Sequence, residues 1–169
     1  AGESHISKIK KITKKIKFHK SDYIFISAPE NVAWLLNIRG YDNPNSPIPN
    51  SRLIIGKNRE IFLFTQKNKV SKILSEKKFN NCKIIDPKNF EKFIKNLKGK
   101  KFIIDSLTCS IKNENIINSK FKIIAINDPC YELKSVKNSS EIKNMINAHL
   151  MDGIALTKFI FWIKNKNNR

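Results

Sequence analysis

The sequence has few of the residues on which common cofactor and phosphate sites depend. Only five glycines occur, and none falls in the glycine-rich patterns that bind a dinucleotide or a nucleoside triphosphate. The three cysteines, Cys82, Cys109 and Cys130, are widely separated and form no Cys-X-X-Cys pair. An odd count at this spacing argues against a disulfide framework and favours reduced thiols, as in a cytoplasmic protein.

Long apolar runs and arginine are also scarce. No segment approaches the roughly 18 apolar residues that a membrane-spanning helix requires, and the N-terminus lacks the apolar core of an export signal. We therefore expect no membrane partner. Of the 33 basic residues only four are arginine, the residue that phosphate and base recognition favours because its planar guanidinium donates two parallel hydrogen bonds.

The net charge of +19 nevertheless makes a basic nucleic-acid-binding module the alternative hypothesis for function. The charge comes almost wholly from lysine, in a composition that is also rich in isoleucine and asparagine, as an AT-rich coding sequence would produce. Aromatic residues do not alternate with the basic ones as they would on a single-strand-binding surface. We therefore prefer to interpret the lysines as solvated surface, and nucleic acid is not the expected partner.

Hydrophobic periodicity predicts an α/β fold, a mixed β-sheet flanked by helices and followed by a long C-terminal helix. Ser4 is expected to cap a helix at 5–19, with Lys8, Lys11 and Lys15 on its solvated face. The hairpin pattern at 56–58 would make the sheet mixed rather than wholly parallel. Strands are predicted at 22–27, 51–56, 59–64, 82–85, 101–105 and 121–126, and further helices from Pro29 and at 67–78, 88–97, 111–118 and 139–164.

A domain boundary is expected near residue 130. Residues 1–130 would form the mixed sheet with its helices, and residues 131–169 the start of a second domain. The helix predicted from Ser139 has a wide apolar side that includes Phe159 and Trp162, and such a helix needs another surface to cover it. We expect this side to be incompletely packed within the chain or covered by a neighbouring molecule.

Two groups of residues could carry chemistry, and both are weak candidates. Asp86, Asp105 and Asp128 stand at strand ends, where a two-metal nuclease would gather carboxylates, but we interpret them as turn and cap residues. His149 and Asp152 share a helix face, yet two ligands do not make a metal site. A structural pair, such as a buried His149–Asp152 hydrogen bond, is the preferred interpretation. No catalytic residue and no metal ligand is predicted.

Two longer segments are more informative. The first runs from Glu30 to Asp42 and reads Glu-Asn-Val-Ala-Trp-Leu-Leu-Asn-Ile-Arg-Gly-Tyr-Asp, with Pro47 after it. The second lies between Leu133 and Trp162 and contains Lys137-Asn138, Glu141, Met145, Ala148-His149, Asp152-Gly153 and Ala155-Leu156. In this order they resemble two segments of the Xaa-Pro aminopeptidases (aminopeptidase P). The first is similar to a signature of the middle, creatinase N-terminal-like domain, and the second to the segment that opens the catalytic domain.

The resemblance implies a creatinase N-terminal-like domain at 1–130 and the truncated start of a pita-bread catalytic domain at 131–169. Enzymes of this family release the N-terminal residue of peptides with proline in second position, with two metal ions, usually manganese, held by the catalytic domain. None of the family's metal ligands corresponds to a residue of this chain. We therefore expect a non-catalytic portion of a cytoplasmic peptidase, without a cofactor of its own, as an excised piece or a truncated gene product.

The expected role of this portion is to wall the active-site cleft and to support assembly with the remaining domains of the parent peptidase, or in a homodimer. Trp34, Arg39 and Asp42 are the predicted rim residues, because Arg39 and Asp42 follow a helix end, in a loop where functional groups are commonly presented. An internal Arg39–Asp42 pair with Trp34 in the core is the alternative. A free-standing interaction partner of an intact peptidase is the third hypothesis.

Overall fold

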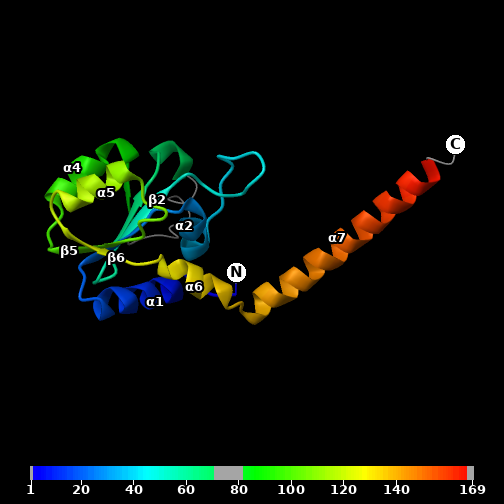
Figure 1. Ribbon diagram of the computed structural model, residues 1–169, viewed down its shortest axis with the longest axis horizontal. Coiled ribbons are helices and arrows are strands. Elements are labelled where there is room, and N and C mark those ends of the chain that lie inside the picture. The colour runs from blue at the N-terminus through cyan, green and yellow to red at the C-terminus, as the bar shows by residue number, and fades with distance from the viewer. Residues whose placement is uncertain (1, 71–81, 167–169) are drawn as a thin grey trace. The chain divides into compact units, whose positions relative to one another are not determined.

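The computed structural model describes residues 2–70 and 82–166 of the chain (Figure 1). The chain divides into two compact units, one formed by Ser4–Ser135 and the other by residues 1–3 with Val136–Arg169. The first unit contains α1 (His5–Phe18), β1 (Tyr23–Ile26), α2 (Pro29–Leu36), β2 (Arg52–Gly56), β3 (Ile61–Phe64), η1 (Lys67–Val70), β4 (Cys82–Ile85), η2 (Pro87–Asn89), α4 (Phe90–Asn96), β5 (Lys101–Ile104), α5 (Ile111–Asn118), β6 (Lys122–Ala125) and α6 (Pro129–Ser135). The second unit contains α7 (Ser139–Lys166).

The six strands form one sheet in the order β4-β3-β2-β1-β5-β6. Strand β2 is antiparallel to both β1 and β3, whereas the β1–β5, β5–β6 and β3–β4 pairs are parallel. Five strands therefore point in one direction and β2 alone opposes them, which confirms the mixed sheet that the hairpin pattern predicted. We call the side where the five parallel strands end the carboxyl edge, and the side where they begin the amino edge.

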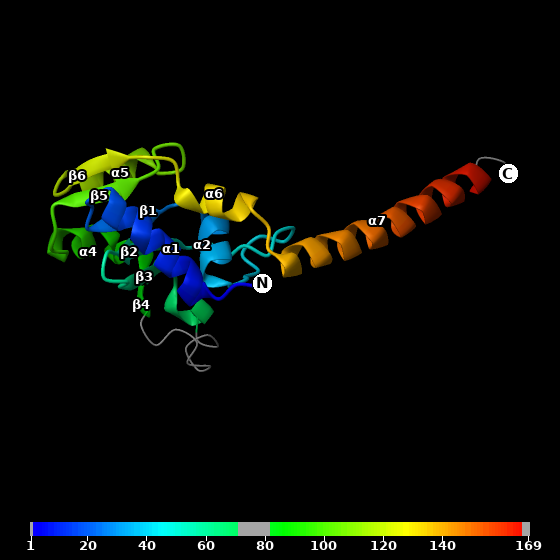
Figure 2. The same cartoon turned by 90° about the horizontal axis from the view of Figure 1, so that it is seen from below.

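Successive strand residues belong to two hydrophobic cores, one mainly aliphatic and the other rich in aromatic residues. Ile24 and Leu53 belong to an aliphatic core that also contains residues of α1, α2 and α6. Phe25, Phe62 and Phe102 belong to an aromatic core shared with α4 and α5. Figure 1 shows α4 and α5 on one side of the sheet, and Figure 2 shows α1, α2 and α6 on the other. The expected sheet with helices on its faces is therefore confirmed.

Helix α1 has a well-defined start and end. The Ser4 side chain accepts a hydrogen bond from the Ser7 amide, so the predicted cap is confirmed. At the other end Lys20 adopts the left-handed conformation, with φ of 49°. The Lys20 amide donates to the Lys17 carbonyl and the Ser21 amide to the Ile16 carbonyl, which is the Schellman pattern of hydrogen bonds that usually has glycine in this place.

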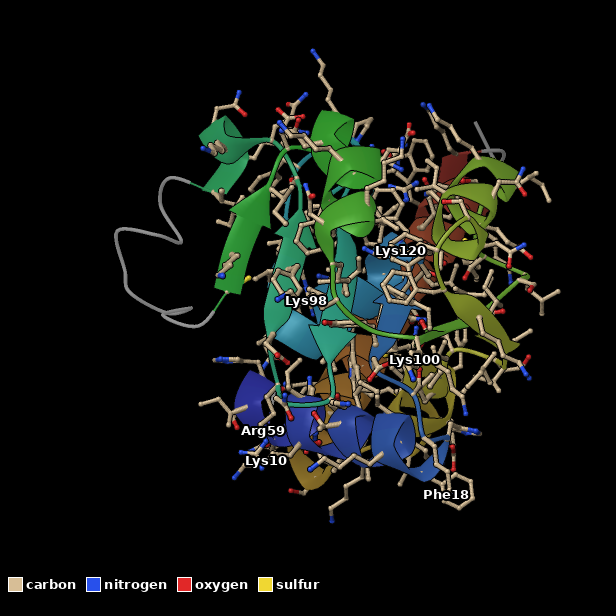
Figure 3. The ribbon with its side chains drawn as sticks, turned by 90° about the vertical axis from the view of Figure 1, so that its left-hand side faces the viewer. Lys10, Phe18, Arg59, Lys98, Lys100 and Lys120 are labelled. Carbon is tan, nitrogen blue, oxygen red and sulfur yellow. The ribbon has the colours of Figure 1, made fainter. Side chains whose placement is uncertain are left out.

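Lysines gather at the amino edge. Lys98 and Lys100 precede β5, Lys120 precedes β6, and Arg59 lies in the β2–β3 turn. Figure 3 shows these four side chains on one face of the unit, together with Lys10 of α1. All five are exposed, as expected of a solvated lysine surface.

Helix α6 was not predicted from the sequence. It starts at Pro129, a residue that fits the first turn of a helix, and its Cys130 is fully buried in the aliphatic core. The first compact unit therefore continues to Ser135. The division at residue 130 refers to the domains of a longer protein and stays a prediction. Of the helix predicted at 67–78, residues 67–70 form η1, and the rest lies outside the described residues.

Helix α7 confirms the predicted long C-terminal helix and comprises 28 residues. Asn138 and Glu141 form a capping box, in which each side chain accepts a hydrogen bond of 3.0 Å from the backbone amide of the other. No residue of α7 is buried, and the rings of Phe159 and Trp162 stack with 6.1 Å between their centres. Among the helices in the described ranges, none is long and apolar enough to cross a membrane.

Candidate functional site

The candidate site begins where α2 ends. Asn37 adopts the left-handed conformation with φ of 55°, and its amide donates to the Trp34 carbonyl at 3.3 Å. The Ile38 amide then donates to the Ala33 carbonyl at 3.0 Å. This turn ends the helix and leads the chain into the 39–50 loop, which returns to the start of β2 at the carboxyl edge.

A buried lysine holds this turn in place. Lys8 of α1 is only 1% exposed, and its Nζ donates to the Trp34 carbonyl and to Asn37 Oδ1, both at 2.7 Å. The same Nζ lies 4.1 Å from the centre of the Trp34 ring. A cation is favourable here because the end of a helix carries partial negative charge. The expectation that Lys8 lies on a solvated face is therefore wrong, since α2 places its C-terminus over that position of α1.

The 39–50 loop is closed by contacts across its base. The Gly40 amide donates to the Pro47 carbonyl at 3.1 Å. One oxygen of Asp42 accepts from the Asn50 amide at 2.6 Å, and the other from Lys69 Nζ at 2.7 Å. The hydrogen bond from Lys69, followed by that from Asn50, holds the pKa of Asp42 below its ordinary value. The Asp42 carboxylate is therefore charged at neutral pH and joins the loop to η1.

A cavity of about 440 Å³ opens beside this loop. Arg39, Tyr41 and Asp42 line it, and Leu63 and Val70 supply apolar surface from β3 and η1. Tyr41 is 98% exposed, and Arg39 Nη1 donates to the Ile38 carbonyl at 2.8 Å. A guanidinium, an exposed phenol and apolar side chains together provide hydrogen-bond donors next to apolar surface.

The structure brings two of the three predicted rim residues together. Arg39 and Asp42 line the same cavity, whereas Trp34 packs against the aliphatic core and Lys8. The alternative Arg39–Asp42 pair is not formed, because Asp42 binds Lys69 and Arg39 donates to backbone carbonyls. Lys69 was missed because it lies 27 residues from Asp42 and no short motif joins them. The role of these residues at the rim of a cleft stays a prediction.

A second polar cluster joins α2 and α6 at the carboxyl edge. Asp128 is 3% exposed and accepts from Asn31 Nδ2 at 2.7 Å and from the Cys130 amide at 2.8 Å. Lys134 Nζ donates to Asn31 Oδ1 at 2.5 Å, and the Asp128 amide donates to Asp105. Burial raises the pKa of Asp128, and its hydrogen bonds offset only part of this effect.

The aspartates at the strand ends act as turn and cap residues, as predicted. Asp86 accepts from the Lys88 amide at 2.9 Å, and Asp105 accepts from the Leu107 amide at 3.0 Å. Asp128 accepts from the amide two residues later in the same way. Each carboxylate satisfies a backbone donor where a strand gives way to a turn.

His149 and Asp152 are exposed on α7, and no hydrogen bond joins them within the part of the chain that the structure describes. Their pairing inside a longer protein stays a prediction. Residues 2–70 and 82–166 contain no group of three or more His, Cys, Asp or Glu side chains placed to hold a metal ion. Burial raises the pKa of the Cys82 and Cys109 thiols to about 11, so both are protonated at neutral pH.

Comparison with known proteins agrees with this architecture. The Creatinase/Prolidase N-terminal domain matches residues 1–141. Xaa-Pro aminopeptidase 1 of Dictyostelium discoideum is 28% identical over 167 residues, covering 98% of this chain and 26% of that protein. Xaa-Pro aminopeptidase ApepP of Drosophila melanogaster is 29% identical over 165 residues, covering 94% of this chain and 26% of the relative. The chain thus spans about a quarter of the length of these relatives.

Solved structures give the same result. The X-prolyl aminopeptidase of Caenorhabditis elegans, a cytosolic enzyme with a di-nuclear active site, superposes with a TM-score of 0.87 at 26% identity, over 97% of this chain and 28% of that one. The N-terminal domain of the cytoplasmic peptidase PepQ from Mycobacterium tuberculosis shares the fold, with a TM-score of 0.57 at 13% identity over 75% of this chain and 98% of that one. The resemblance to Xaa-Pro aminopeptidases expected from the segments at 30–42 and 133–162 is confirmed, and the chain belongs to the Creatinase/Prolidase N-terminal domain family.

Proposed function

We propose that this chain is a non-catalytic portion of a cytoplasmic Xaa-Pro aminopeptidase, and that further domains of the parent carry out the reaction. The observation that supports this most strongly is the similarity of 97% of the chain to a stretch that makes up only 28% of the C. elegans enzyme. The parent would release the N-terminal residue of peptides that have proline in second position. Two metal ions, with manganese as the expected metal, would serve that reaction in the rest of the protein.

The donor groups in residues 2–70 and 82–166 do not fit a two-metal site. His149 and Asp152 offer two ligands on one helix, fewer than a single catalytic metal ion requires. No other described group of His, Cys, Asp and Glu side chains supplements them. No step of the hydrolysis is therefore assigned to a residue of this chain.

The contribution of this chain is a wall of the substrate cleft. In this proposal the Arg39–Tyr41–Asp42 surface contacts the part of a peptide beyond the reacting bond and limits its length. Lys69 holds Asp42 charged, and Lys8 fixes the helix end from which the loop departs. The wall is therefore presented by a rigid frame rather than by a free loop, which lowers the entropic cost of binding a peptide.

Helix α7 is proposed to be the start of the catalytic domain. Its apolar residues include Phe159 and Trp162, more than half exposed at 54% each. A helix with so much exposed apolar surface gains stability when a second domain covers it. The expected partners of this helix are the remaining domains of the parent peptidase, or a second copy of the parent in a homodimer.

The proposal is tested first on the purified chain and on the DNA after the codon for Arg169. We expect no hydrolysis of an Xaa-Pro peptide with added manganese, and a continuation that encodes two aspartates, one histidine and two glutamates as metal ligands. Turnover by the purified chain would exclude the non-catalytic assignment. A gene without such a continuation would favour the free-standing interaction partner.

The proposed role in the cleft wall is tested in the longer protein with the variant Arg39→Gln. The control is Arg59→Gln, which removes the same charge at the amino edge. We expect the first change to raise KM for long peptides by about tenfold, the loss of one charge-assisted hydrogen bond, with kcat and dipeptide hydrolysis unchanged. An equal effect of both variants would exclude the wall. The alternative of a nucleic-acid-binding module receives no support from the similarities above.

A further inference from the structure

A second cavity, of about 360 Å³, opens at the carboxyl edge on the other side of Lys69. It is lined by residues at the start of β2, the end of β3 and the starts of η2, α4 and α5. It therefore lies outside the carboxyl ends of the parallel strands β3 and β4, where open α/β sheets commonly bind ligands. None of the roles described above uses this cavity.

One positive charge in this cavity has no acidic partner among residues 2–70 and 82–166. Within the described part of the chain Arg52 makes one long hydrogen bond of 3.4 Å, from Nη1 to Asn50 Oδ1, which leaves most of its five donors available there. Lys69, on the same wall, is neutralised by Asp42 at 2.7 Å. The described residues that line the cavity include no carboxylate. The site therefore presents a net charge close to +1, which matches a monoanion.

The rest of the lining combines the apolar residues Phe64, Pro87 and Phe90 with the carboxamides of Asn50, Gln66 and Asn113. Phe64 and Phe90 are 2% and 8% exposed, and their rings meet edge to face with 5.1 Å between centres. Asn50 and Asn113 supply amide donors and acceptors near Arg52. An inorganic phosphate would leave the aromatic floor without a partner, whereas an anion with an apolar group uses both parts.

We propose that this cavity binds a small organic carboxylate whose apolar group packs on Phe64 and Phe90. The Arg52 guanidinium receives the carboxylate through two parallel hydrogen bonds, the geometry that matches its planar fork. An acylated amino acid and the C-terminal residue of a peptide share this chemistry. The site is separate from the Arg39 cavity, and it can exist whether or not the chain belongs to a cleft wall.

The test is a titration of the isotopically labelled 169-residue chain, followed by two-dimensional NMR. N-acetyl-leucine is expected to shift the Arg52 Nε–H signal and the side-chain amides of Asn50 and Asn113, and to saturate them. N-acetyl-leucinamide, which has the same apolar group without the charge, is expected to leave them in place. Arg52→Gln should weaken binding by about tenfold or more, the loss of a charge-assisted hydrogen-bond pair, and Arg59→Gln should leave it unchanged.

Additional measurements identify which carboxylates bind and show whether the variants remain folded. Arg52→Lys keeps the charge but removes the fork, and it should still weaken binding severalfold in a chain whose spectrum remains dispersed. If a tripeptide binds with a free C-terminal carboxylate but not when that carboxylate is amidated, peptides are one class of ligand for the site. If neither form of the tripeptide binds, the ligands are small free acids. Equal weakening by Arg52→Gln and Arg59→Gln, equal shifts with the uncharged amide, or tighter binding of inorganic phosphate would each overturn the proposal.

Discussion

Asp22 and Asp128 stabilise opposite edges of the same sheet, and their pKa values move in opposite directions. At the amino edge Asp22 accepts from the amides of Lys100 and Lys101 and pairs with Lys57 at 2.7 Å. Burial alone would raise the pKa of Asp22, but Lys57 and the two amides together lower it to about 2. At the carboxyl edge burial raises the pKa of Asp128, although it too accepts backbone and side-chain hydrogen bonds.

The difference lies in the partners. Asp22 faces an ammonium group and water on the lysine-rich edge, so its charged form is favoured. The side-chain partners of Asp128 are Asn31 and Cys130, neither of which is a cation, and the nearby Asp105 carboxylate also raises the pKa of Asp128. Lys134 of the same cluster donates to Asn31. Asp22 is thus stabilised by an ion pair at the exposed amino edge, whereas Asp128 is stabilised by a buried hydrogen-bond network that joins α2 and α6.

Replacing the buried carboxylate should have the largest effect. Asp128→Ala removes the acceptor of Asn31 and of the Cys130 amide inside the core, so the free energy of unfolding should fall by about 3 kcal/mol. Asp22→Ala should cost only about 1 kcal/mol, because water replaces a partly exposed carboxylate. Urea denaturation of both variants measures the two losses. Equal losses would show that the edges do not differ in this way.

Glycine substitutions should distinguish the two edges next. A Cβ on Gly40, in the carboxyl-edge loop, would lie 2.7 Å from Pro49 Cβ and 2.8 Å from Pro49 Cα, so Gly40→Ala should cost about 2 kcal/mol. A Cβ on Gly56, at the amino edge, would meet chiefly the end of the flexible Glu60 side chain. Gly56→Ala should therefore cost under about 1 kcal/mol. Thermal unfolding tests this, and a larger loss for Gly56→Ala would contradict it.

The contributions of Asp22 and Asp128 to the free energy of unfolding should change in opposite directions with pH. The lowered pKa of Asp22 contributes stability above its unfolded value near 4, and this is lost as the pH falls through about 2. After allowance for solvent screening the loss should be about 1 kcal/mol, and Asp22→Asn should abolish it. The raised pKa of Asp128 predicts a loss as the pH rises from 4 through its folded value, which Asp128→Asn should remove. The midpoints of urea unfolding between pH 2 and 7, measured for the wild type and each Asn variant, give the two contributions. If the contributions of Asp22 and Asp128 changed with pH in the same direction, the comparison would be refuted.

The smallest expected effect is a small increase in the free energy of unfolding when Lys20, at the amino edge, is replaced. Lys20 holds the left-handed position of a Schellman turn, where glycine carries no steric penalty. Lys20→Gly should therefore stabilise the chain by about 0.5 kcal/mol. The control Lys14→Gly, at an exposed position inside α1, should cost about 1 kcal/mol because glycine is unfavourable in a helix interior. Destabilisation by both would mean that the Lys20 turn carries no strain.

The patterns along the chain were sufficient for most of the architecture. Short apolar runs rich in strand-forming residues located all six strands, and apolar residues at helical spacing located the long helix. Helix α6 escaped notice because Asp128-Pro129 indicates a turn as readily as a helix start, and only its packing decides between them. Cys130 anchors that helix in the core, a contact that no local pattern contains.

The candidate site was predictable only in part. The Glu30–Asp42 segment identified Arg39 and Asp42, which do line one cavity. The two lysines that organise them, Lys8 and Lys69, come from α1 and η1, and in a lysine-rich sequence nothing marked them as different from solvated neighbours. Their roles depend on the way α2 crosses α1 and the loop meets η1, which is a property of the tertiary fold.

The position of β1 in the sheet also imposes an order on synthesis. Strand β1 pairs with β2, which follows it closely in the chain, and on its other side with β5. Tyr23 can therefore pair with Phe102 only after β5 has been synthesised. On the ribosome, the β1–β2–β3 meander can therefore form while one side of its first strand still has open hydrogen-bonding groups. Once Phe64 has emerged, closing that side needs about forty more residues, through Ile104 at the end of β5, which at about 10 residues per second takes about four seconds. During that interval the nascent chain exposes an edge of Ile24 and Phe25 that is buried in the finished protein, and this is the stage at which we expect it to need a chaperone most.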